Sequence, residues 1–225
     1  MSDQEPSSSQ EPSKTLAQRA PEVAGNVLRQ ILEFAIDGNM TIPGAKDAAA
    51  RSLQTRGDHE AAVDWLIRQH VGLAGAQGFL TNLGGLLALP VALPTNLAGL
   101  AIIQMRMIAA IAHLRGYDVN DRRVRSALTL AMLGEDEVRK QVSSGKLAST
   151  PMGIATAPVF DPALEHSVSE RVFGGLGAKM AGKHVVVQVA KRIPLVGGGV
   201  GAAADGYFTY ALGQYARREF IRRRG

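Results

Sequence analysis

Two glycine-rich stretches of the sequence resemble phosphate-binding loops, so nucleotide chemistry is the first possibility to examine. Residues 177–183 read GAKMAGK and match the first seven places of a P-loop, but the eighth is His184 instead of the Ser or Thr that holds Mg²⁺. Residues 197–205 read GGGVGAAAD and contain a G-x-G-x-x-A pattern. A dinucleotide fingerprint needs a strand before it and a parallel sheet around it, and the one β-like patch is HVVVQVA at 184–190. A small-residue helix surface with solvated lysines explains residues 177–183 better than nucleotide binding does, and close helix–helix contact explains the glycines of 197–205 better.

The other reactive side chains form no recognisable catalytic set. The sequence contains no cysteine, which excludes disulfides, zinc thiolates, iron–sulfur clusters and a Cys nucleophile. No two histidines are spaced i, i+4, and no G-x-S-x-G elbow is present. Residues 58–60 (DHE) with Asp64 could gather a cation, but a capped and solvated first helical turn explains them better. We therefore predict no catalytic residues, no metal and no cofactor, although an enzyme of unrecognised class stays open.

Polar residues inside apolar sequence are better candidates for a functional site. A buried charge must be paired, and breaking a buried pair costs about 3–5 kcal/mol. Arg106 and Asp205 each interrupt a different apolar helix, so we expect them to pair or one of them to face a polar pocket. The alternative is that Arg106 extends to the surface and Asp205 caps a turn. The full set is Thr81, Asn82, Thr95, Asn96, Gln104, Arg106 and Asp205.

These residues lie in or near a long apolar run that could cross a membrane, form a core or line a hydrophobic pocket. The sequence carries no charge from Val71 to Met105. Pro90 and Pro94 interrupt it, and each piece is of borderline length for a span of about 20 apolar residues. We expect a buried helical hairpin, broken over 81–96.

The remaining sequence predicts an all-α fold with a single compact multi-helix domain. Residues 1–20 are rich in Ser, Gln, Glu and Pro and are expected to be a disordered polar tail, and residues 21–225 form the domain. Asp58 is the expected N-cap of a helix that runs to about Leu80, and Asp118 or Asn120 caps a later one. Helices are expected at 21–38, 45–54, 58–80, 94–115, 121–133, 135–142, 163–173, 176–190 and 195–222, with a loop at 143–153.

The net charge of +5 is concentrated at the C-terminus. A basic end beside apolar helices suits anionic lipid headgroups at about 1 kcal/mol per basic residue, although a solvated end that aids solubility is equally compatible. We see no nucleic-acid motif and expect no nucleic-acid partner. The N-terminus is not a secretory signal, so we place the protein in the cytoplasm, peripheral on the inner face of the cell membrane. The candidate lipid contacts are Arg217, Arg218, Arg222, Arg223 and Arg224.

The chain resembles the EcsC family of bacterial proteins over roughly residues 45–222. The resemblance rests on the Gly-Gly-Leu and Pro-x-x-x-Pro segment within 76–134, on IAHLRGYD and on KRIPLVGGG, followed by an Asp and the closing YARREF. It implies a helical protein and transfers no catalytic residue. Arg106, Asp118 and Asp205 fit the family pattern, whereas Asn96 replaces an expected acidic residue, which argues against metal or acid–base chemistry there. The candidate ligand-binding residues are Asn82, Asn96, Arg106, Asp118 and Asp205.

Three functions remain open from the sequence. The first is a non-enzymatic protein that associates with membranes or binds a lipid or hydrophobic ligand. The second is a soluble helical module that binds a protein partner. The third is an enzyme centred on Arg106, Asp118 and Asp205.

Overall fold

The structure, a computed structural model, describes residues 16–39, 42–76, 95–175 and 197–223, and it confirms the all-α fold. Over these ranges the only β-type pairing is an isolated bridge between Gly38 and Pro43. A further helical stretch occupies residues 162–175. The remaining helices are α1 (Leu16–Asp37), α2 (Ala45–Arg56), α3 (His59–Gly75), α4 (Thr95–Leu114), α5 (Arg122–Ala131), α6 (Glu135–Ser143), α7 (Pro151–Ala155) and α9 (Gly197–Glu219).

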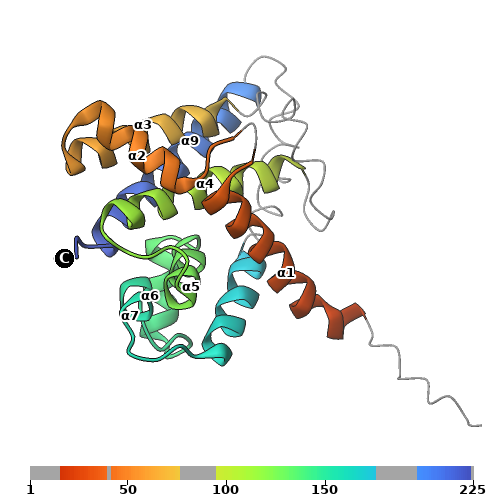
Figure 1. Cartoon of the computed structure of the whole chain (residues 1–225). Helices are drawn as coiled ribbons and strands as arrows, with labels where there is room; N and C mark the ends of the chain where they lie inside the picture. The colour runs from red at the N-terminus through yellow and green to blue at the C-terminus, as the bar shows by residue number, and fades with distance from the viewer. Residues whose placement is uncertain (1–15, 40–41, 77–94, 176–196, 224–225) are drawn as a thin grey trace, which may run out of the picture.

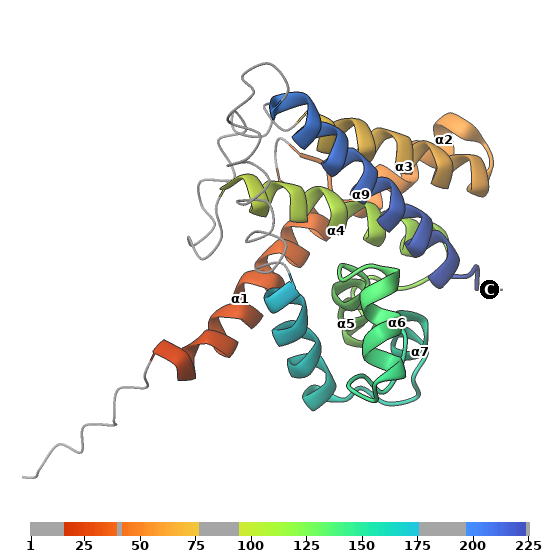
Figure 2. The ribbon, with the colours of Figure 1, turned by 180° about the vertical axis from the view of Figure 1, so that it is seen from behind.

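Three helices that are far apart in the sequence, α3, α4 and α9, pack along one another and form the centre of the molecule (Figures 1 and 2). A Cβ atom added at Gly213 of α9 would touch both Ile67 of α3 and Met107 of α4, and one added at Gly206 would touch Val71. Since the contact residue number on α3 rises as that on α9 falls, these two helices are antiparallel. Gln104 of α4 meets Thr209 of α9, and Met107 lies beside Gly213 further along both helices. The contact residue numbers rise together, so α4 runs parallel to α9.

The other helices cover this three-helix core from two sides. Helix α1 packs along α4, and α2 packs against both α3 and α4. Helices α5, α6 and α7 form a second group together with the helix at 162–175, placed below the core in Figure 1. Helix α4 is therefore enclosed, and Met105, Met107, Ile108 and Ile111 are fully buried. This second arm of the expected hairpin is a core helix, while the first arm lies outside the described residues.

Several helix ends agree with the sequence prediction. Asp58 caps α3, its carboxylate accepting from the Ala61 amide at 2.9 Å, and this bond holds the Asp58 pKa below its ordinary value. Gly116, just beyond the end of α4, has a φ of +84°, which only glycine adopts easily, and the helix ends there as predicted.

Other boundaries differ from the prediction. Helix α3 ends at Gly75, before the expected Leu80, because glycines at 72, 75 and 78 each cost about 1 kcal/mol in a helix. The cap of α5 is Asp121, which accepts from the Arg123 amide at 2.8 Å. Asp118 instead closes the preceding turn by accepting from the Asn120 amide, so the prediction of Asp118 or Asn120 as the cap was wrong.

The N-terminal tail and the loop expected at 143–153 also differ from the prediction. Helix α1 begins at Leu16, so residues 16–20, expected in the polar tail, are helical, while 1–15 lie outside the described residues. Thr150 and Pro151 start the short helix α7 inside the expected loop at 143–153. The P-loop-like stretch at 177–183, HVVVQVA at 184–190 and the helix expected over 176–190 also fall outside the described ranges.

Candidate functional site

Polar side chains are buried where α4 meets α9. The Gln104 amide donates to the Thr209 hydroxyl at 3.1 Å, and these residues are 7% and 0% exposed. Asp205 lies one turn before Thr209 on α9 and is also buried, with interactions of its own. The expected polar residues Gln104 and Asp205 are thus brought to one helix–helix interface, together with Thr209, which the sequence analysis did not select.

Arg106 is on the opposite side of α4. Successive helical residues are turned by about 100°, so Arg106 points roughly 200° away from Gln104 and hence away from α9. Its charged neighbours are Arg51 and Asp47 of α2. Burial lowers the pKa of Arg106, Arg51 lowers it further, and Asp47 opposes both. The ion pairs between described residues do not include one that joins Arg106 to Asp205.

His70 is the second unusual polar group in the core. It is 0% exposed, its Nδ1 lies 2.7 Å from the Leu66 carbonyl oxygen, and its Nε2 has no hydrogen-bond partner in the described structure. Burial lowers the pKa of His70 to about 4, and the nearby charge of Arg106 acts in the same direction. The imidazole is therefore neutral at physiological pH.

The other candidate ligand-binding residues do not join this interface. Asp118 is exposed in the turn after α4, and the end of α4 at Leu114 is already about 12 Å along the helix from Arg106. Asn96 falls in the first turn of α4, and its side chain lies outside the described structure. Asn82 lies outside the described residues altogether. An active site centred on Arg106, Asp118 and Asp205 gains no support from this geometry.

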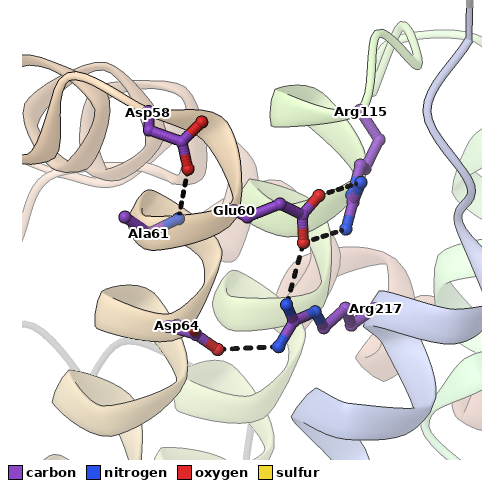
Figure 3. Close-up of polar contacts among 6 residues, drawn as sticks. All are labelled: Asp58, Glu60, Ala61, Asp64, Arg115 and Arg217. Carbon is purple, nitrogen blue, oxygen red and sulfur yellow. Dashed lines mark hydrogen bonds and ion pairs between the residues drawn. The ribbon is translucent and has the colours of Figure 1, made fainter.

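One end of the three-helix core is closed by a cluster of ion pairs (Figure 3). Glu60 of α3 accepts from Arg115 at 2.5 and 3.0 Å and from Arg217 of α9 at 2.9 Å. Arg217 also contacts Asp64 at 2.7 Å. Glu60 and Asp64, read from the sequence as a solvated first turn, therefore bind two arginines instead, and their i, i+4 spacing is the signal that places both carboxylates on one face.

The remaining arginines of the C-terminus lie at this same end. Arg218 pairs with Glu135 of α6, which lowers the Glu135 pKa. Arg222 is exposed. The Arg223 amide donates to the Arg115 carbonyl oxygen at 2.9 Å, and its guanidinium lies 5.5 Å from the centre of the Tyr117 ring. Arg224 is outside the described residues. Of the five proposed lipid contacts, Arg217 is thus held by two carboxylates and Arg223 lies beside Tyr117. Arg218 is paired with Glu135, although its side chain stays 57% exposed.

Three exposed aromatic side chains lie near the middle of α9. Tyr207, Phe208 and Tyr210 are 68%, 57% and 49% exposed, although their chain neighbours Gly206 and Thr209 are buried. Tyr207 and Tyr210 share a helical face with Arg218, since these positions are three and eight residues apart. Phe208 is turned about 100° from Tyr207 and about 160° from Tyr210, so these side chains together span nearly half of the helix circumference. We call Tyr207, Phe208, Tyr210 and Arg218 the α9 face. The sequence analysis did not select its aromatic residues, although the i, i+3 spacing of the two tyrosines was visible.

Two features are absent from the described residues. No helix among them is long and apolar enough to cross a membrane. No group of three or more His, Cys, Asp or Glu side chains is placed there to hold a metal ion.

The chain matches the EcsC protein family over residues 7–224 and belongs to that family. No curated protein and no solved structure matches the chain.

Proposed function

We propose that this EcsC-family protein binds the surface of an anionic membrane peripherally, with the α9 face against the lipid. The observation that carries the proposal is the exposure of three aromatic side chains on one helix. Only 5% of the residues are aromatic, so three exposed within four positions are a marked concentration. Aromatic rings, above all tyrosines with an apolar body and a polar tip, favour the boundary between lipid and water.

The charge along α9 supports the same orientation. Arg218 lies on the face of Tyr207 and Tyr210, and Arg222 follows exposed after the helix ends. Basic residues near an anionic surface add about 1 kcal/mol each. A helix lying in the plane of the surface would put the aromatic half and the basic half in contact with it together. Arg217 is turned to Glu60 and Asp64 instead, and we assign it no lipid contact.

Vesicle flotation tests the proposal. We expect the protein to float with vesicles that contain phosphatidylglycerol. The triple variant Tyr207→Ser, Phe208→Ser, Tyr210→Ser should lose at least about tenfold in affinity. The matched control is Val159→Ser, since Val159 is 75% exposed but belongs to the other group of helices. Absence of wild-type flotation, or a triple variant that floats like wild type, would reject the proposal and favour a protein partner for this face.

A further inference from the structure

An open cleft of about 490 Å³ lies between α1, α5 and the helix at 162–175. None of its lining residues comes from α9, so it is separate from the α9 face. Figure 2 shows α1, α5 and the helix at 162–175 as neighbours in space, although they are far apart in the sequence. Its volume is within the range of small-molecule sites in proteins, roughly 300–1,000 Å³.

The cleft is lined by more basic than acidic side chains. Arg29 comes from α1, and Arg122 and Arg125 come from α5, three residues apart and hence on one helical face. Glu33 of α1 and Glu165 of the 162–175 helix are its acidic residues. The three arginines outweigh the two carboxylates by one positive charge.

Of the three arginines of the cleft, only Arg122 is hydrogen-bonded to one of its two carboxylates. Arg122 is hydrogen-bonded to Glu165 at 3.0 Å and lies 4.0 Å over the Phe160 ring, so it is held firmly. Arg125 is 3.7 Å from Glu33, too far for a hydrogen bond, although its side chain is only 24% exposed. Its guanidinium makes no hydrogen bond to another described residue.

Arg29 adds a second available donor from the facing wall. It is exposed, and no ion pair joins it to any residue in the described ranges. Arg29 and Arg125 thus present guanidinium groups to one cleft from two helices.

We propose that this cleft binds a phosphate-bearing anion, with Arg29 and Arg125 as its donors and Arg122 as a fixed wall. A phosphate group has several charged oxygens that can accept from guanidinium groups on two helices at once. The phosphate is carried by a free metabolite or by a lipid headgroup.

Calorimetric titration of the full-length protein with inorganic phosphate tests the site in 0.1 M salt. We expect the double variant Arg29→Gln, Arg125→Gln to bind at least about tenfold more weakly than wild type. The single variant Arg29→Gln replaces an exposed side chain, so it leaves the fold intact and should show part of the loss. The matched control is Arg139→Gln, which removes the same charge from α6, where Arg139 pairs with Glu135 at 2.7 Å outside the cleft.

A second arm repeats the titration with monomeric dihexanoyl phosphatidic acid. Binding at least tenfold tighter than inorganic phosphate identifies a lipid headgroup, and equal or weaker binding identifies a free phosphate compound. The proposal is overturned if wild type binds neither probe, if the cleft variants bind like wild type, or if Arg139→Gln loses as much affinity as they do. No bilayer is present and the α9 face is unchanged, so the result is independent of the proposed membrane contact.

Discussion

Arg217 of α9 donates to Glu60 of α3 at 2.9 Å, although 157 residues of sequence separate them. The same carboxylate accepts from Arg115 (Figure 3). One acidic side chain thus joins α3, the end of α4 and α9, the three helices of the core. A basic residue that sequence alone assigns to lipid contact is therefore part of the fold.

The Glu60 cluster should stabilise the fold more than an exposed pair does. Arg115 has a side chain that is only 10% exposed, so Glu60→Gln leaves a largely buried charge with a weaker partner. We expect the free energy of unfolding to fall by about 1–2 kcal/mol, measured by urea denaturation. Glu135→Gln is the control, because both of its arginine partners are exposed and such pairs contribute about 0–1 kcal/mol. Equal losses in the two variants would contradict this role.

Close packing of α9 is tested at two of its glycines. A Cβ at Gly213 would lie 2.9 Å from Ile67 and 3.1 Å from the Met107 sulfur, and both of these side chains are buried. We expect Gly213→Ala to destabilise the protein by about 1–3 kcal/mol through overpacking. Gly206→Ala places its Cβ at an ordinary 3.7 Å from Val71 and should be neutral or stabilising, because alanine favours a helix. The midpoints of thermal unfolding of the two variants measure the difference. A Gly213→Ala variant that is more stable than wild type would contradict the close packing at this glycine.

His70 should make stability depend on pH. Its pKa is about 4 in the fold and 6.5 in an unfolded chain. The unfolded state therefore binds a proton first as the pH falls, and stability decreases from about pH 6.5 down to pH 4, by roughly 3 kcal/mol in all. Above pH 7 the His70 imidazole is neutral in both the folded and the unfolded state, so it no longer makes stability depend on pH. His70→Leu should flatten this dependence in urea titrations at pH 7.5 and 5, whereas His113→Gln, at an exposed position, should keep it. An unchanged slope in His70→Leu would show that other groups cause the acid sensitivity.

The exposed end of the arginine tail should contribute to membrane affinity through charge. We expect the double variant Arg222→Gln, Arg223→Gln to bind anionic vesicles about tenfold or more weakly, from roughly 1 kcal/mol per residue. The difference should shrink as salt rises, because screening weakens both proteins toward the same uncharged contribution. Co-sedimentation at 50 and 500 mM NaCl measures it. Arg139→Gln, which changes charge on α6, is the control, and an equal loss there would indicate a general charge effect.

Much of the fold could be predicted because helix signals are local. The Asp58 cap, the stop at Gly116 and the apolar character of α4 all depend on residues within a few positions of one another. The position of the cap before α5 was missed because Asp118 and Asp121 are both suitable, and only the turn geometry decides between them. Glycines shortened α3 for a local reason that could have been weighed more heavily.

The site was harder to predict because it depends on which helices become neighbours. The helical phase already places Gln104 and Arg106 on opposite faces of α4, but only the packing shows that α9 covers the side of Gln104. The pairing of Glu60 with Arg217 likewise joins two helices that no local pattern links. Exposure of Tyr207 and Tyr210 depends on which face of α9 the core leaves uncovered, so their spacing alone could not reveal it.

Membrane contact through the α9 face is measured most directly with a tryptophan at Phe208. The chain has one tryptophan, Trp65, so Trp65→Phe removes the background signal. In that background, Phe208→Trp should be quenched by phosphatidylglycerol vesicles with brominated acyl chains, whereas Val159→Trp should not. Quenching confined to position 208 is the result we predict. No quenching at 208 while the protein is vesicle-bound, or equal quenching at 159, would contradict the proposed function.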